Sequence, residues 1–148
     1  MSAIQVSGRF FILENPEKLL YHWASVRNIQ KDIAYSIRTD LPVFEIEGRM
    51  PPGAVFGTYS AARMFLSEAP ADYDKVYVYH PNPQVVRDRF EAQKGQENLI
   101  ILRADNFLTT YGSVTTPCQT FVDLWNLSDW YAEEFVRALK EQIDELLS

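Results

Sequence analysis

The chain has two histidines, His22 and His80, that could transfer a proton or bind a metal ion. His22 stands beside Trp23 in an apolar stretch, which favours a structural role. His80 ends a predicted strand, and α/β proteins often bind ligands at strand ends, so His80 is a candidate binding residue. Neither histidine belongs to a spaced motif of metal ligands, and the sequence therefore predicts no metal site and no cofactor around them.

The single cysteine, Cys118, follows Thr116 and Pro117 and is predicted to lie in the first turn of a helix. The positive end of a helix can lower the pKa of a thiol, but a small buried cysteine with a packing role is the favoured interpretation. The chain also contains no glycine-rich phosphate loop and no nucleophile elbow. The sequence therefore predicts no catalytic residue.

Two pairs of carboxylates leave one enzymatic alternative open. Glu45 and Glu47 lie two residues apart in an alternating stretch, which would place both on one face of a strand. Asp72 and Asp74 form a second pair, and Glu45, Glu47 and Asp74 could converge on a metal ion in a nuclease-like protein that acts on nucleic acid. No lysine stands at a matching spacing, so solvated pairs are the favoured interpretation and a metal-dependent nuclease is the alternative.

The composition describes one acidic globular domain. The chain has 148 residues, of which 47% are hydrophobic and 23% charged, with a formal net charge of −6; this suits a single core and not a disordered chain. Residues 101–148 carry three basic and eight acidic side chains, which argues against a nucleic-acid backbone along that end. A lone cysteine, no membrane-length apolar run and no signal-peptide pattern predict a cytoplasmic protein without membrane contact.

Strand and helix signals alternate along the chain. Strands are predicted from apolar and β-branched runs at 6–13, 43–47, 54–57, 76–79 and 99–102. Helix starts are predicted from capping residues and prolines at Asn15-Pro16, Thr58, Asn82-Pro83, Thr116 and Ser128 or Asp129.

Three further signals complete this assignment. Thr116 and Gln119 have the spacing of a capping box. Ile29, Ile33 and Ile37 are four apart and could extend the first helix, and residues 107–114 are predicted to form a hairpin or loop. The alternation predicts an α/β fold, a two-layer or three-layer-like sandwich with a mixed central sheet flanked by helices.

Three segments of the second half carry a family resemblance. They are the apolar strand after Asn98, the segment 114–124 that contains Gln119, Asp123 and Leu124, and the closing helix at 132–139. Together they resemble the C-terminal domain of AbiEi-type proteins, the antitoxin and transcriptional-regulator component of type IV toxin–antitoxin systems. Gly57 with Ala61-Ala62, the strand at 76–79 and the opening 8–20 resemble earlier landmarks of that domain, so the resemblance covers most of the chain.

This resemblance implies a non-enzymatic regulatory domain that binds a macromolecular partner. The partner would be a protein such as a nucleotidyltransferase-like toxin, or a second copy of the chain in a homo-oligomer. Such proteins usually carry an N-terminal winged helix-turn-helix, for which there is no room ahead of Gly8, so DNA binding is expected only through a domain outside this chain. Gln119 and Asp123 are candidate binding residues, and bracing of the chain near Asn126 is the alternative role for Asp123.

Aromatic side chains are candidate anchors for a partner, because Trp and Tyr provide a large contact area at low entropic cost. The candidates are Tyr111, Trp125, Trp130 and Tyr131, with core packing as the alternative for each. A third hypothesis is a small-molecule sensor with a pocket near His80 at the strand ends.

Overall fold

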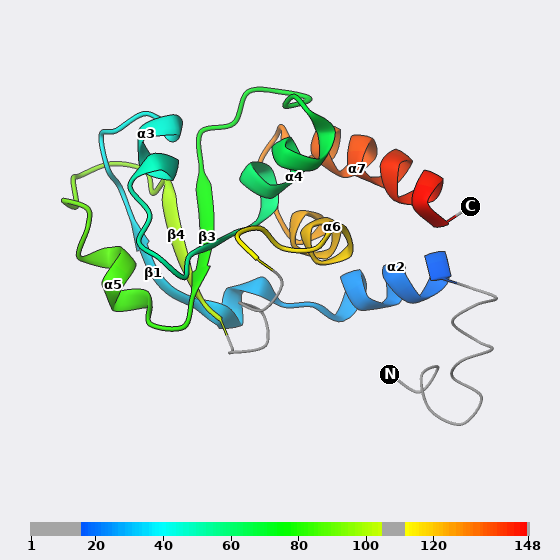
Figure 1. Ribbon diagram of the computed structural model, residues 1–148, viewed down its shortest axis with the longest axis horizontal. Coiled ribbons are helices and arrows are strands. Elements are labelled where there is room, and N and C mark those ends of the chain that lie inside the picture. Colours follow the sequence, from blue (N-terminus) through cyan, green and yellow to red (C-terminus); the bar gives the residue numbers. More distant parts are fainter. Residues whose placement is uncertain (1–15, 105–111, 148) are drawn as a thin grey trace.

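The computed structural model describes residues 16–104 and 112–147, and its strands form one four-stranded sheet in the order β1-β4-β3-β2 (Figure 1). The central strands β3 and β4 are parallel, and β1 and β2 pair antiparallel with them on either side. The predicted mixed sheet is therefore confirmed. The strands are β1 (Ile33–Ile37), β2 (Val55–Phe56), β3 (Val76–His80) and β4 (Leu99–Arg103).

Helices cover both faces of the sheet, which gives three layers (Figure 1). One face carries a four-helix layer, made of α2 (Pro16–Val26), α4 (Thr58–Leu66), α6 (Pro117–Trp125) and α7 (Ala132–Leu147). The other face carries the two short helices α3 (Val43–Gly48) and α5 (Pro83–Arg87). None of the helices in the described ranges is both long enough and apolar enough to cross a membrane.

The two central strands are buried on both faces, as the apolar run at 99–102 predicts. In β3, Val76 and Val78 face the two short helices, whereas Tyr77 and Tyr79 face the four-helix layer. This alternation follows from the two-residue period of a strand, which sends successive side chains to opposite faces. The strand β3 therefore delivers its tyrosines to the larger helical layer, where they meet polar partners.

Two predictions for residues 28–48 are wrong. The isoleucines spaced by four do not extend a helix, because Asn28 accepts a hydrogen bond from the Gln30 amide and starts a short 3₁₀ turn, Ile29–Asp32, that leads into β1. The alternating residues 43–47 form the helix α3 and not a strand. Pro42, in extended backbone, leads into this helix, in which Ile46 is buried and Val43 packs partly buried against the same core.

The helix starts at Pro16, Pro83 and Pro117 are confirmed, and Thr116 caps α6 through the Gln119 amide at 3.2 Å. The predicted cap at Thr58 is wrong. Gly57 is the cap, and Thr58 lies inside α4 with a φ of 43° and a buried hydroxyl that has no hydrogen-bond partner among the described residues. Such a backbone conformation is costly for a β-branched residue.

The last helix, α7, begins at Ala132, and the side chain of Asp129 binds Tyr59 and Lys75 instead of capping it. Ala132, Phe135, Leu139 and Ile143 form a buried stripe along this helix, which is therefore amphipathic. The predicted strand at 6–13 and most of the predicted loop at 107–114 lie outside the described residues.

Candidate functional site

The candidate residues Gln119 and Asp123 lie one turn apart on α6 and belong to a buried polar cluster. Asp123 is fully buried, and its carboxylate accepts hydrogen bonds from Gln119 Nε2 at 2.9 Å, the Tyr79 hydroxyl at 2.6 Å and Arg27 Nε at 3.1 Å. Arg27 follows α2, donates to the Tyr79 hydroxyl at 3.0 Å and pairs with Asp32 at 2.8 Å. We call Arg27, Tyr79, Gln119 and Asp123 the Asp123 cluster.

The Asp123 carboxylate is shielded from solvent, and Arg27 balances its charge. Burial raises the pKa of the Asp123 carboxyl, while its hydrogen bonds from Tyr79 and Gln119 and the charge of Arg27 favour the ionised form. Burial and the neighbouring carboxylate raise the pKa of Tyr79 well above its usual range, so Tyr79 remains a hydroxyl that can donate. Three donors surround a carboxylate that has no exposed surface. Among the described residues, the cluster therefore joins the end of α2 to β3 and α6, and the Asp123 carboxylate is not accessible to a ligand.

His80 is buried at the end of β3, away from the Asp123 cluster. Its Nε2 lies 2.9 Å from the carbonyl oxygen of Pro52, and its Nδ1 accepts a hydrogen bond from the Asn82 amide at 2.9 Å. Gly53, at a φ of +88°, lets the backbone pass this ring, because a Cβ there would lie 3.3 Å from Nε2. Both ring nitrogens are engaged, so this arrangement gives no support to a ligand site at His80.

The aromatic candidates divide into surface and core. Trp125 ends α6 and is 46% exposed, with its ring packed edge-on against Tyr21 at a centroid distance of 5.4 Å. Trp130 is 81% exposed, whereas its neighbour Tyr131 is buried. The remaining candidate, Tyr111, lies outside the described residues.

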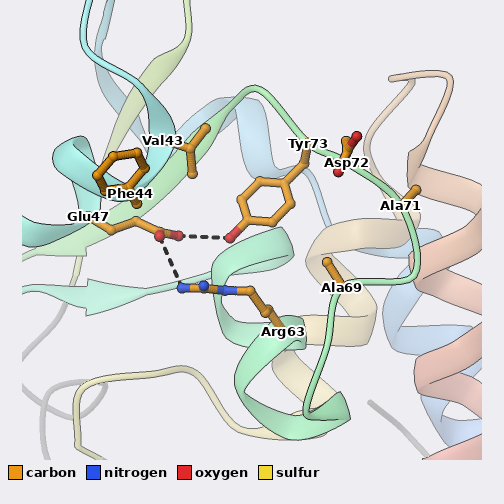
Figure 2. A pocket seen from close by; sticks show the side chains of 8 residues that line it. All are labelled: Val43, Phe44, Glu47, Arg63, Ala69, Ala71, Asp72 and Tyr73. Carbon is orange, nitrogen blue, oxygen red and sulfur yellow. Dashed lines mark hydrogen bonds and ion pairs between the residues drawn. The ribbon is translucent and has the colours of Figure 1, made fainter.

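A surface pocket of about 220 Å³ lies between α3, α4 and the segment 67–73 (Figure 2). Its centre is the carboxylate of Glu47, which accepts hydrogen bonds from the Ser60 hydroxyl at 2.5 Å, the Tyr73 hydroxyl at 2.9 Å and Arg63 Nη2 at 3.0 Å. We call these four residues the Glu47 cluster, and the cavity the Glu47 pocket. The pocket is lined by Val43, Phe44, Glu47, Arg63, Ala69, Ala71, Asp72 and Tyr73.

The Glu47 pocket retains binding capacity that the Asp123 cluster lacks. Arg63 uses one nitrogen on Glu47, and its side chain is 43% exposed. Asp72 is exposed and makes no hydrogen bond or ion pair with the residues that the structure describes. Burial and the nearby Glu47 raise the pKa of Tyr73 to about 12, so its hydroxyl stays protonated near neutral pH. The pocket thus presents an unused carboxylate and unused guanidinium donors.

Sequence reasoning missed this pocket. The sequence favours a solvated carboxylate at Glu47, with a metal ligand as the alternative, and it predicts no role for Ser60, Arg63 or Tyr73. These residues come from α3, α4 and the segment before β3, so no single spacing joins them. The Glu47 carboxylate was the one residue of this cluster that the sequence had indicated as a candidate for a site.

The carboxylates proposed for a nuclease do not converge. On the helix α3, Glu45 and Glu47 project in different directions, because positions two apart do not share a helical face. Glu47 is engaged by Ser60, Arg63 and Tyr73, and Asp74 accepts a hydrogen bond from the Tyr131 hydroxyl at 2.5 Å. Within residues 16–104 and 112–147, no group of three or more His, Cys, Asp or Glu side chains is placed to hold a metal ion.

Cys118 lies in the first turn of α6, as predicted, and is half-buried. Burial raises the pKa of its thiol, which lowers the fraction of thiolate near neutral pH. This environment agrees with a packing role.

Comparison of the chain with protein-family models, with curated proteins and with solved structures found no match. The family resemblance seen in the sequence therefore remains a prediction. The geometry described above carries the functional argument.

Proposed function

We propose that this chain is a regulatory domain, of the antitoxin type that the sequence resemblance implies, and that it acts by binding a macromolecular partner. The observation that carries this proposal is the exposure of Trp130, at 81% of its surface. Phe44 and Met64 are similarly exposed, at 70% and 65%. Tryptophan is enriched at protein interfaces and among the residues that dominate binding energy.

The environment of Trp130 supports a role in binding. Its indole packs edge-on against the ring of Tyr131, with centroids 5.3 Å apart. Tyr131 is buried, and its hydroxyl is bound to Asp74. The exposed ring therefore stands beside a fixed neighbour, and a pre-ordered aromatic anchor loses less entropy when it binds.

A protein is the favoured kind of partner. The exposed carboxylates Glu133 and Glu134 follow Trp130 in the first turn of α7, and they would repel a phosphate backbone. A nucleotidyltransferase-like toxin or a second copy of the chain fits this expectation. The alternative of a metal-dependent nuclease has no ligand group to support it in the described ranges.

The test is a pull-down of the tagged domain from its native lysate, with and without nuclease, followed by mass spectrometry. We expect one nuclease-resistant protein at near-equal amount with the wild type. Trp130→Ala should lose this protein, whereas Val85→Ala, which truncates an exposed apolar side chain on the opposite helical layer, should retain it. Both variants should keep the circular dichroism spectrum of the wild type, because neither side chain is buried.

Two results would contradict the proposal. One is the absence of any stable protein partner, and the other is a signal that disappears with nuclease. The second result would direct attention to nucleic acid and to the carboxylates of α3.

A further inference from the structure

The Glu47 pocket has the size and lining to receive one long side chain. Its volume of about 220 Å³ is below the range of roughly 300–1,000 Å³ that is typical of small-molecule sites. Val43, Ala69 and Ala71 provide apolar wall, and Phe44, which is 70% exposed, stands at the pocket with its ring available to solvent (Figure 2). Such a lining suits the aliphatic stem of a side chain that carries a polar head.

The charges of the pocket favour a cation as that head. Glu47 and Asp72 contribute two carboxylates against the single guanidinium of Arg63. Arg63 and two hydroxyls already occupy Glu47, but Asp72 makes no hydrogen bond or ion pair with other described residues. A planar guanidinium can bind a carboxylate such as that of Asp72 through two parallel hydrogen bonds.

We propose that the Glu47 pocket binds an arginine side chain presented by a basic segment of the partner protein. This proposal rests on the proposed function, because it names the chemistry of the partner. The arginine stem lies along Ala69 and Ala71, and its guanidinium pairs with Asp72, which is on the same side of the Tyr73 ring as these alanines (Figure 2). The net charge of −6 on the whole chain would also attract a basic segment before contact.

Another surface pocket of the described residues offers no comparable preference for charge. This pocket, of about 200 Å³, balances Arg49 and Arg89 against Asp40 and Glu91. Its lining therefore favours neither sign of charge, whereas the Glu47 pocket carries an excess of acid and an unused carboxylate.

The first experiment is an NMR titration of the whole ¹⁵N-labelled chain with the peptide acetyl-Gly-Arg-Gly-amide. We expect saturable shifts of amide signals from the segments 43–47 and 69–73. The same peptide with citrulline, which has the shape of arginine without its charge, should give much smaller shifts. A glutamate peptide tests the opposite charge and should leave these signals in place.

Two variants that each remove one negative charge distinguish binding in the pocket from attraction by the overall charge of the protein. Asp72→Asn should lower the affinity for the arginine peptide by about three- to tenfold, as expected for the loss of one charged hydrogen-bond acceptor. Glu68→Gln removes the same charge from an exposed position nearby that does not line the pocket, and it should leave the affinity unchanged. Equal weakening by both variants, equal binding of citrulline, or no saturable shift would overturn the proposal.

The pull-down then separates this inference from the proposed function. Loss of the captured partner with Asp72→Asn, but not with Glu68→Gln, would support both. Retention of the partner with Asp72→Asn would overturn the docking role of the pocket and leave the proposed function intact. Peptide binding without any captured partner would support the chemistry of the pocket and count against the proposed function.

Discussion

The Asp123 cluster and the Glu47 cluster are built from the same parts. Each centres on one carboxylate that accepts hydrogen bonds from a tyrosine, an arginine and a third donor, Gln119 in the first and Ser60 in the second. They differ in exposure. Asp123 has no exposed side-chain surface and Arg27 has 15%, whereas Glu47 has 10% and Arg63 has 43%.

This difference separates a structural cluster from a candidate binding site. A carboxylate sealed among α2, β3 and α6 can only hold those elements together. A similar carboxylate at the wall of a pocket, beside the unused Asp72, can hold its neighbours and still contribute to the recognition of a cation. Residue types alone therefore do not identify a binding site. Two clusters of the same residue types differ in role because one is accessible to solvent and the other is not.

The largest expected effect contrasts the two carboxylates. Asp123→Ala should lower the free energy of unfolding by about 3 kcal/mol, because it leaves the largely buried Arg27 and the buried Tyr79 hydroxyl without their main partner. Glu47→Ala should cost about 1 kcal/mol, because Arg63 can turn to water. Urea denaturation followed by circular dichroism measures both values. Equal losses would break the comparison.

The tyrosines should repeat this contrast on a smaller scale. Tyr79→Phe removes a hydroxyl that both donates to Asp123 and accepts from Arg27, and we expect a loss of about 1.5 kcal/mol. Tyr73→Phe removes one donor from a carboxylate that keeps two others, and we expect about 0.5 kcal/mol. The same denaturation assay measures both values. A larger loss for Tyr73→Phe than for Tyr79→Phe would contradict the assignment of the Asp123 cluster as the more buried of the two.

Salt should act on only one of the two arginines. The pair of Arg63 with Glu47 is open to solvent on the arginine side. It is worth about 0.2–1 kcal/mol, and salt at about 1 M should screen most of it. The stability cost of Arg63→Ala should therefore shrink between low and high salt. The cost of Arg27→Ala should change little, because Asp123 is shielded from solvent. Parallel changes for both variants would show that the two clusters are equally accessible to ions.

The last contrast is expected at alkaline pH. The pKa of Tyr73 is raised from 10.0 to about 12, so the folded chain holds this proton more tightly than the unfolded chain does. The corresponding stability is present below pH 10 and is lost as the pH rises through 12. Tyr73→Phe should therefore lose less stability than the wild type over this range. Identical alkaline profiles would contradict the burial of Tyr73.

Sequence patterns predicted the parts of this fold whose signals are local. The apolar run at 99–102 and the prolines at 16, 83 and 117 predicted β4 and three helix starts, because strand burial and first-turn geometry depend on a few neighbouring residues. Residues 43–47 alternate like a strand, but the extended Pro42, the packing of Val43 and Ile46 and the hydrogen bonds of Glu47 favour the helix α3. Tertiary packing overrides propensity most easily in elements this short.

The two clusters show why sites are harder to predict than elements. The family resemblance marked Gln119 and Asp123 together, but Arg27 and Tyr79 lie far from them in the sequence. In the Glu47 cluster, no spacing indicated that Tyr73 and Arg63 would meet one carboxylate. Their meeting depends on how α3, α4 and the segment before β3 are arranged in space.

The Asp123 cluster also has a consequence for the order of assembly. Arg27 binds groups that are 52 and 96 residues away along the chain. Closing such long loops costs chain entropy before any contact can repay it, and contacts of large sequence separation slow folding. We therefore expect α2 to join the four-helix layer late in folding, after β3 and α6 have already met through Tyr79 and Asp123. In the native state, the amide protons of α2 should exchange with solvent earlier than those of most other helices.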